Sequence, residues 1–356
     1  MRANPVIPLG HLLLAALCLL LLACGSGDSD LQLGEERQSP NEAANTAAMI
    51  DAIRAVSLQR YPEGTVQRFN QSKTLGCFDA VFTVPDDLDP ALQQGIFVAG
   101  ASYPAQLRFA SATEEDDRDK DFRGLSIKIH NTPGTALWGE PGQQDFLLNS
   151  YPALFAADPG DFLDFINATR DGKLWRYFIN PSHFYSLAIV LKGREKIDNP
   201  LAIPYWSTTP YRYGGDSSSA VKYSVRPCEA GAAPIEVEKH KDFLRDAMRE
   251  QLEKGGACFQ FMVQFQVDPD TMPIEDASVI WDEAQSPFVR IAEIRIGSGA
   301  TSADTDTVEN CEAMTFNPWQ SLAAHQPLGG INRTRKPIYA EIGEFRDRQN
   351  RLRGAH

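Results

Sequence analysis

Short segments in which apolar and polar residues alternate recur along the chain and constrain its fold more than any other feature. Residues 258–267 and 288–296 alternate with a period of two, which is typical of half-buried β-strands. Similar strand-like runs lie at 77–84, 105–111, 124–130, 144–149, 185–191 and 220–225. Because these runs do not alternate regularly with helices, we expect an α+β protein, an antiparallel β-barrel or sandwich with helical insertions and a helical C-terminus.

Three segments between and beside the strands have helical periodicity instead. Residues 45–61 place their apolar side chains on one face, with Asn45 as a possible N-cap. Residues 158–168 and 237–255 show a similar pattern, and Gly255 stands where a helix C-cap would. No internal repeat and no second linker is evident, so we expect a single domain, and 43% apolar residues are sufficient for its core.

The N-terminal segment is typical of an export signal. Arg2 is the only charge before an apolar run of about 13 residues, shorter than the ~20 residues that span a bilayer. We interpret residues 1–23 as a signal peptide, 24–45 as a flexible tether and 46–356 as the folded domain. The sequence "LLACG" around Cys24 resembles a bacterial lipobox. This implies lipidation of Cys24 and an outer-membrane lipoprotein, with plain secretion to the periplasm as the alternative.

The net charge indicates which partners are not expected, and the cysteines indicate the compartment. The chain has 34 basic and 47 acidic residues, a formal net charge of −13, so nucleic acid is not an expected partner. Behind the signal peptide lie four cysteines, in a compartment where disulfides can persist: Cys77, Cys228, Cys258 and Cys311. Four cysteines allow three pairings, and the sequence neither chooses among them nor excludes buried free thiols.

Common catalytic motifs are missing from the sequence. The absence of G-x-S-x-G, H-E-x-x-H, G-x-x-x-x-G-K-[ST] and G-x-G-x-x-G removes the usual hydrolase, metalloprotease and nucleotide-binding classes. With six histidines in the whole chain, we expect structural or surface roles for them and no multi-histidine metal site. The acidic run at 114–121 lacks the spaced ligands and the glycine of a calcium loop, so we expect a solvated loop.

Several short motifs, in a consistent order, resemble the catalase family, particularly its small bacterial members. "LRFASATEEDDRDKDFRGLSIKIH" is similar to the family's R-F-S segment, acidic loop and D-x-R-G strand, and "QDFLLNSYPALF" to its D-L-V-G-N-N-x-P-x-F-F stretch. "YWSTTPYRYGGDSSSAVKYSVRP" and "FNPWQSLAAHQPLGGINRTRKPIYAEI" are similar to segments of the small members. The resemblance extends from about Tyr61 to Asp347. It implies a catalase-like barrel of eight antiparallel strands wrapped by helices.

The resemblance assigns two residues to the distal side of a haem. In catalases a distal His moves a proton between the peroxide oxygens, and a distal Asn orients the peroxide. The Asn falls on Asn149, although an Asn that caps a turn would look the same. In "RFNQSKTLGC", Arg68, Lys73 and Gly76–Cys77 keep the family's frame, and Gln71 stands in the place of the His. Because Gln cannot take up a proton near neutral pH, we expect impaired dismutation of hydrogen peroxide.

The resemblance also assigns residues that would hold the haem. Arg68 and Arg108 fall on propionate-binding positions, although structural salt bridges would explain them as well. Catalases hold iron through a Tyr in an R-x-x-x-Y helix, where Arg and Tyr share a face. Arg335 and Tyr339 have this spacing, in a helix expected to begin near Pro337, so Tyr339 is a candidate iron ligand. The same residues also resemble a segment that precedes the haem helix, in which case the proximal helix is missing.

Three functions are compatible with these features. The first is a catalase- or peroxidase-like haem oxidoreductase of the envelope that acts on hydrogen peroxide or organic hydroperoxides, with impaired dismutation. The second is a haem-free pseudo-enzyme of the same fold that serves as a binding or scaffold lipoprotein. The third is a haem enzyme that rearranges fatty-acid hydroperoxides.

Overall fold

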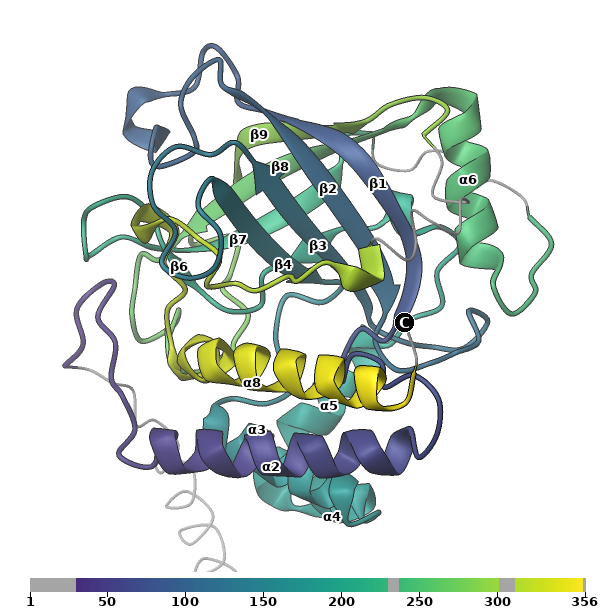
Figure 1. Cartoon of the computed structure of the whole chain (residues 1–356). Helices are drawn as coiled ribbons and strands as arrows, with labels where there is room; N and C mark the ends of the chain where they lie inside the picture. The colour runs from purple at the N-terminus through teal and green to yellow at the C-terminus, as the bar shows by residue number, and fades with distance from the viewer. Residues whose placement is uncertain (1–29, 230–236, 301–310, 355–356) are drawn as a thin grey trace, which may run out of the picture.

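Nine strands of the described residues form one antiparallel sheet (Figure 1). A computed structural model of the chain describes residues 30–229, 237–300 and 311–354. The strand order is β5-β4-β3-β2-β1-β9-β8-β7-β6, and pairing of β5 with β7 closes eight strands into a barrel, with β6 beside β7. The strands are β1 (Lys73–Thr83), β2 (Ser102–Ser111), β3 (Arg123–His130), β4 (Gln143–Asn149), β5 (Tyr205–Trp206), β6 (Tyr211–Arg212), β7 (Ala220–Pro227), β8 (Ala257–Phe265) and β9 (Val289–Ile296). This confirms the predicted single-domain α+β fold with a barrel of about eight antiparallel strands.

Aromatic side chains fill the inside of the barrel. Phe82, Phe146, Tyr223 and Phe261 are all buried and form a continuous set of ring contacts, the closest between Phe146 and Phe261, whose centroids are 4.8 Å apart. Successive side chains of a strand point to opposite faces, so alternate residues reach this interior. Removal of their apolar surface from water stabilises the barrel. A ligand site is therefore expected at the ends of the barrel rather than inside it.

The prediction of a strand at 185–191 was wrong, because these residues belong to helix α5 (Phe184–Gly193). A short apolar run has no decisive periodicity of its own. In the structure Phe184, Ala188 and Leu191 are exposed at the i, i+4 and i+7 spacing of one helix face. The sheet instead contains β5 and β6, each of two residues, which are too short to produce a sequence pattern.

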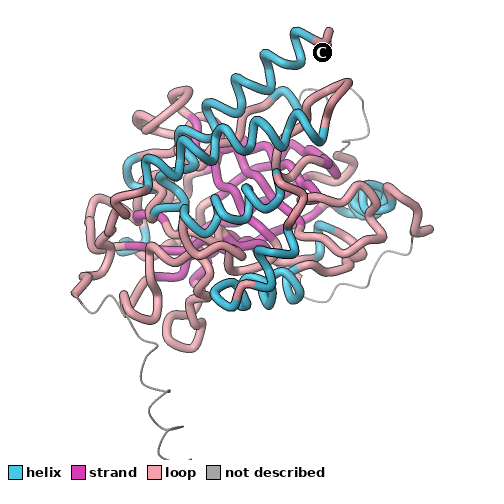
Figure 2. The backbone as a smooth tube through the Cα atoms, turned by 90° about the horizontal axis from the view of Figure 1, so that it is seen from below, coloured by secondary structure: helices cyan, strands magenta, loops and turns pink. Residues whose placement is uncertain are grey.

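A layer of helices covers one end of the barrel (Figures 1 and 2). Figure 1 shows α8 lying between α2 and the barrel, and α3 packs against both α2 and α8. Ala52 and Ile53 of α2 and Ile166 of α3 form an apolar cluster against which Ile338 and Ile342 of α8 pack. The α-helices are α2 (Glu42–Arg60), α3 (Pro159–Arg170), α4 (Leu174–Ile179), α5, α6 (Phe243–Gly255) and α8 (Gly330–Leu352). The described residues also contain four 3-10 helices, at Pro90–Leu92, Pro181–His183, Pro200–Ala202 and Ala323–His325.

The predicted helices exist, but several of their ends differ from the prediction. α2 begins at Glu42 after Asn41, so Asn45 lies inside it. α6 begins at Phe243, later than predicted, and its C-cap is Gly256, whose φ of 80° favours glycine, rather than Gly255. α8 begins well before Pro337, which lies inside it. Periodicity locates the middle of a helix better than its ends.

The described part of the predicted tether lies against the domain. The backbone N–H of Gly34 donates to Gln266 at 2.8 Å, and the backbone N–H of Arg37 donates to Glu275 at 2.9 Å. The expectation of a flexible segment up to residue 45 is therefore corrected, since composition alone does not reveal such docking contacts. The predicted signal peptide and Cys24 lie outside the described residues. Among the described helices, none has the length and apolar character needed to cross a bilayer.

Part of the acidic run at 114–121 is buried rather than solvated. Asp117 forms an ion pair with Lys73 at 2.8 Å, and both side chains are buried. Asp121 accepts hydrogen bonds from the backbone N–H groups of Thr113 and Glu114 at 2.8 and 2.9 Å. A carboxylate can be buried when it is paired in this way, and sequence does not show such long-range partners.

Two disulfide bonds settle the pairing that the sequence left open. Cys228 and Cys258 join the end of β7 to β8, and Cys77 and Cys311 join β1 to a segment 234 positions away. Disulfides of this kind are typical of proteins in oxidising compartments. The second disulfide lies beside the residues that the sequence assigned to a haem site.

Candidate functional site

Gln71, just before β1, has an unusual backbone conformation. Its φ of 58° lies in the left-handed region, which residues with a Cβ rarely adopt. Its N–H donates to the Asn70 side chain at 2.9 Å, and its carbonyl accepts a hydrogen bond from Arg108 Nη2 at 2.8 Å. Such a conformation costs roughly 1–3 kcal/mol and persists only where its surroundings hold it. These two bonds therefore fix the direction in which the Gln71 side chain points.

The amide of Gln71 lies directly over β3. A Cβ added to Gly124 would stand 2.3 Å from Gln71 Oε1, so the glycine leaves the room that the amide occupies. Oε1 is buried and has no hydrogen-bond partner in the described structure. Gly124 pairs with Asn149 in the β3–β4 ladder, and Asn149 Oδ1 accepts from the Ser150 N–H at 3.2 Å. The structure thus brings the two predicted distal residues together at one end of the barrel.

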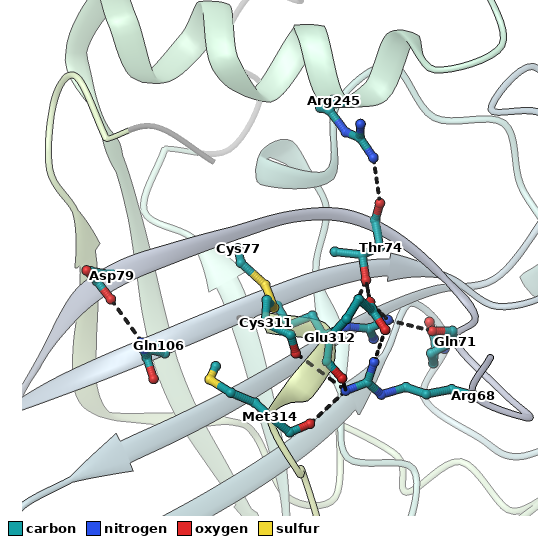
Figure 3. The surroundings of a disulfide bond; sticks show 11 residues. Arg68, Gln71, Thr74, Cys77, Asp79, Gln106, Arg245, Cys311, Glu312 and Met314 are labelled. Atoms are coloured by element: carbon teal, nitrogen blue, oxygen red, sulfur yellow. Dashed lines mark hydrogen bonds and ion pairs between the residues drawn. A yellow bond between two sulfur atoms is a disulfide. The ribbon is translucent and has the colours of Figure 1, made fainter. Parts of the chain in front are cut away.

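Next to Gln71, two arginines converge on one carboxylate (Figure 3). We call Arg68, Thr74, Arg108 and Glu312 the arginine cluster. Arg108 is 2% exposed, and it donates from Nε to Thr74 Oγ1 at 3.0 Å and from Nη2 to Glu312 Oε1 at 3.1 Å. Arg68 donates from Nη1 to Glu312 Oε2, and the Thr74 hydroxyl donates to Glu312 Oε1. One carboxylate therefore receives hydrogen bonds from three side chains.

The segment that carries Glu312 is fastened to the barrel in two ways. Arg68 Nη2 donates to the carbonyl oxygens of Glu312 and Met314 at 3.0 and 2.7 Å. The neighbouring Cys311 forms its disulfide with Cys77, which stands directly opposite Arg108 in the β1–β2 ladder. The covalent link and the arginine contacts therefore meet at the same point of the sheet, as Figure 3 shows.

The two arginines of the cluster are buried side by side and share one anion, Glu312. Burial, and then the neighbouring Arg108, lowers the pKa of Arg68 to about 9, while Glu312 opposes this shift. Burial also lowers the pKa of Arg108, and Glu312 again opposes it. A guanidinium nevertheless stays protonated at neutral pH. Glu312 therefore supplies the negative charge that allows two buried cations to lie side by side.

Arg335 and Tyr339 form a separate pair on α8. Arg335 Nη2 donates to Tyr339 Oη at 2.9 Å, and its guanidinium carbon lies 5.2 Å from the centre of the tyrosine ring. Arg335 Nη1 also donates to the Asn332 side chain at 3.2 Å. Residues four apart on a helix are neighbours, so the R-x-x-x-Y spacing directly creates this contact.

Another residue of α8, Arg346, lies near the arginine cluster. Tyr339 and Arg346 are two helical turns apart and share a face, with a rise of about 10 Å between them. Arg346 lies close enough to both arginines of the cluster to repel them electrostatically. Within the three described ranges, no hydrogen bond or ion pair joins Tyr339 itself to the cluster.

These residues match the chemistry of a haem site at the iron ligand but not at the propionates. A phenol beside a guanidinium is a suitable iron ligand, and the Arg335–Tyr339 pair has this arrangement. The orphaned Oε1 of Gln71, which lies over Gly124 of β3, offers an unused acceptor. Arg68 and Arg108 would suit propionates, but they already bind Glu312. Tyr339, beside Arg335, therefore has the chemistry of a haem iron ligand. The arginines that would bind the haem propionates are instead paired with Glu312.

Six of these residues were predicted from the sequence, whereas Thr74 and Glu312 were not. Gln71 and Asn149 are neighbours across Gly124, Arg68 and Arg108 share an anion, and Arg335 and Tyr339 share a hydrogen bond. Glu312 belongs to no motif. The available signal was its neighbour Cys311, because a pairing of Cys311 with Cys77 would have placed Glu312 beside β1.

Comparison with solved structures identifies the architecture. Catalase A from Saccharomyces cerevisiae superposes with a TM-score of 0.65 at 17% identity, covering 81% of this chain and 62% of that chain. The protein has the catalase fold. A fungal catalase gives 0.65 at 15% identity over 81% and 61% of the two chains, and a bacterial catalase gives 0.63 at 14% over 81% and 58%.

Curated relatives agree with this fold at low identity. The allene oxide synthase-lipoxygenase protein of Plexaura homomalla is 26% identical over 278 residues, which cover 70% of this chain and 24% of that protein. The catalase of the Onchocerca volvulus endobacterium is 20% identical over 282 residues, covering 70% and 54%. The chain thus spans only part of the length of either relative. No family model matches the chain.

Proposed function

We propose that this protein is a catalase-like haem oxidoreductase that acts on hydrogen peroxide or organic hydroperoxides and dismutates hydrogen peroxide weakly. The observation that carries the proposal is the 2.9 Å hydrogen bond from Arg335 to Tyr339 Oη on α8. Haem, when bound, would supply the redox chemistry. Tyr339 would hold its iron, and Arg335 would stabilise the negative charge on the phenolate oxygen.

Gln71 and Asn149 decide what the distal side does to a peroxide. The Asn149 amide can orient a peroxide by hydrogen bonding, and the Gln71 amide can both donate and accept. Gln71 cannot carry a proton from one peroxide oxygen to the other, a role that typically contributes about 10²–10⁴-fold to a rate. The site therefore retains orientation and loses proton transfer, which is the basis for weak dismutation.

Within this proposal, organic hydroperoxides are the favoured substrate class. The similarity to the allene oxide synthase-lipoxygenase protein supports a fatty-acid hydroperoxide, rearranged rather than dismutated. Rearrangement within one molecule does not require the distal proton shuttle that Gln71 lacks. Turnover of a fatty-acid hydroperoxide above that of hydrogen peroxide would support this choice, and the reverse order would count against it.

The proposal is tested by titrating the protein with haem and recording the Soret band. Stoichiometric haem should give a band that Tyr339→Phe abolishes and that Tyr61→Phe, a change elsewhere in the chain, leaves intact. A titration without a Soret band, or a band that survives unchanged in Tyr339→Phe, would overturn the assignment of Tyr339.

One observation favours a second candidate function, a haem-free binding or scaffold protein of the same fold. Both arginines that would bind propionates already hold Glu312, and a disulfide fastens the adjacent residue. This function requires that no haem binds to the wild-type protein under any condition. The same titration therefore separates the two candidates.

We further propose that the protein is exported and attached to the outer membrane through lipidated Cys24. The "LLACG" sequence and the two disulfides support export to an oxidising compartment. Cys24→Ser should release the protein into the soluble fraction of the envelope, whereas continued membrane association would contradict lipidation.

A further inference from the structure

The arginine cluster has the donor arrangement of a carboxylate-binding site. Two guanidinium groups and one hydroxyl converge on a single carboxylate, and both of its oxygens are bound. Arginine is well suited to this task because its planar donors match carboxylate geometry. In this chain the carboxylate is that of Glu312, which comes from a segment more than 200 residues away in sequence.

The disulfide gives this internal carboxylate a large advantage over any free one. Glu312 directly follows Cys311, whose partner Cys77 faces Arg108 across the β1–β2 ladder. A short covalent link of this kind produces an effective concentration of the order of millimolar or higher. A free carboxylate at micromolar concentration would therefore not displace Glu312. Because Cys77 and Cys311 are both buried, the link is also protected from thiol reagents.

The side chains of the cluster differ in exposure, and this leaves a route for a small anion. The Glu312 side chain is 38% exposed, whereas those of Arg68 and Arg108 are 15% and 2% exposed. The cations therefore lie deeper than the anion. Removal of the Glu312 carboxylate would leave two partly desolvated cations at the bottom of a gap that is open to solvent.

We propose that Glu312 is the built-in ligand of a carboxylate site formed by Arg68, Arg108 and Thr74, held there by the Cys77–Cys311 disulfide, and that it excludes external carboxylates from this site. The chemical class that the site takes is a monocarboxylate. As a consequence that rests on the proposed function, a haem bound through Tyr339 would make no use of these arginines for its propionates.

The direct test is rescue of a truncated variant by acetate. Glu312→Ala should melt at a lower temperature than the wild type, and 50 mM sodium acetate should raise its melting temperature by at least ~2 °C over equal sodium chloride, because a ligand stabilises the state that binds it. The wild type should not respond to acetate. Glu341→Ala, which removes an exposed carboxylate paired with Arg54, is the matched control and should not respond either.

Equal responses to acetate in Glu312→Ala, the control and the wild type would overturn the proposal. If Glu312→Ala does not fold in chloride, its folding in acetate is the same test. If it folds in neither salt, Glu312→Asp, which keeps a carboxylate, should be more stable than Glu312→Asn. Equal stability of these two variants would overturn the proposal as well.

A second arm compares haem with haem dimethyl ester, whose propionates are blocked. The wild type should bind both with affinities within about twofold, whereas Glu312→Ala should prefer the free acid by at least fivefold, since each freed arginine contact with a carboxylate is strong. A fivefold preference in the wild type would overturn the exclusion of external carboxylates. Absence of haem binding in every variant would refute the proposed function only, because the acetate test contains no haem.

Discussion

In both the arginine cluster and the Arg335–Tyr339 pair, a guanidinium donates to a side-chain oxygen, but the two differ in the sequence separation and charge of their partners. The cluster joins segments that are far apart in sequence, balances its own charge and is fastened by a disulfide. The pair lies within one turn of α8 and its acceptor is a phenol. The comparison teaches that buried arginines indicate a ligand site only after their partners within the chain have been identified.

Removal of the Cys77–Cys311 disulfide, which anchors the segment that carries Glu312, should have the largest effect on the free energy of unfolding. This bond closes a loop with a sequence separation of 234, against 30 for Cys228–Cys258. Loop-closure entropy predicts that the Cys77→Ser, Cys311→Ser protein loses about 1–2 kcal/mol more stability than the Cys228→Ser, Cys258→Ser protein. Denaturant unfolding of both measures the difference. A smaller loss for the protein without Cys77–Cys311 would contradict this loop-closure account.

Acidification should lower the free energy of unfolding through a histidine inside the barrel, rather than through the arginine cluster or the Arg335–Tyr339 pair. Burial lowers the pKa of His325 to about 3, so its ring stays neutral in the folded protein. The unfolded chain binds a proton below about pH 6.5, so stability rises with pH between about 3 and 6.5 and is lost as pH falls. His325 alone should contribute a loss of ~2 kcal/mol between pH 7 and pH 5.

The His325 contribution is measured as the difference in pH dependence between wild type and His325→Gln. Denaturant unfolding at several pH values should give a flatter profile for the variant than for the wild type. Parallel profiles for wild type and His325→Gln would show that His325 is not the acid-sensitive group. The arginine cluster and the Arg335–Tyr339 pair would then be the next candidates.

Restoration of a distal base should sharpen the assignment of Gln71. In haem-loaded protein, Gln71→His is expected to raise the turnover of hydrogen peroxide at least tenfold, because the imidazole restores proton transfer. Oxygen release measures this rate, and Gln67→His, at an exposed position close by, is the matched control. An unchanged rate, or an equal rise in the control, would mean that Gln71 does not face the reacting peroxide.

The smallest effect is expected from Tyr339→Phe in the absence of haem. The change removes one hydrogen bond on a partly exposed helix face, which typically contributes about 1 kcal/mol or less. Glu312→Gln should cost more, since it leaves two buried cations without their counter-charge. If thermal unfolding showed a larger loss of stability for Tyr339→Phe than for Glu312→Gln, the Arg335–Tyr339 pair would contribute more to stability than the arginine cluster, contrary to this account.

Most of the barrel was predictable from the sequence because period-two alternation is a local property. The runs that became β1 to β4 and β7 to β9 carry that signal, and α3 has a capping Asp158 that accepts from the N–H groups of Gly160 and Asp161. Residues 185–191 were misassigned because a uniformly apolar run suits a strand and a helix equally. β5 and β6 were missed because two residues cannot show a period.

Only those site residues that belong to short sequence motifs were predictable. The spacing of Arg335 and Tyr339 fixes their contact, since one helical turn separates them. Glu312 was not predictable, because its position depends on a disulfide across the fold and on two arginines from different segments. The buried Asp117 illustrates the same limit, since it lies in a loop and its partner Lys73 belongs to β1.

The stoichiometry of bound haem, titrated in one series for the wild type, Tyr339→Phe and Glu312→Ala, tests the account most directly. The account predicts one haem per chain with a Soret band in the wild type and in Glu312→Ala, and loss of that band in Tyr339→Phe. Absence of haem from the wild type would contradict it. Binding by Glu312→Ala alone would show that the internal carboxylate excludes the whole cofactor and that the natural protein works without haem.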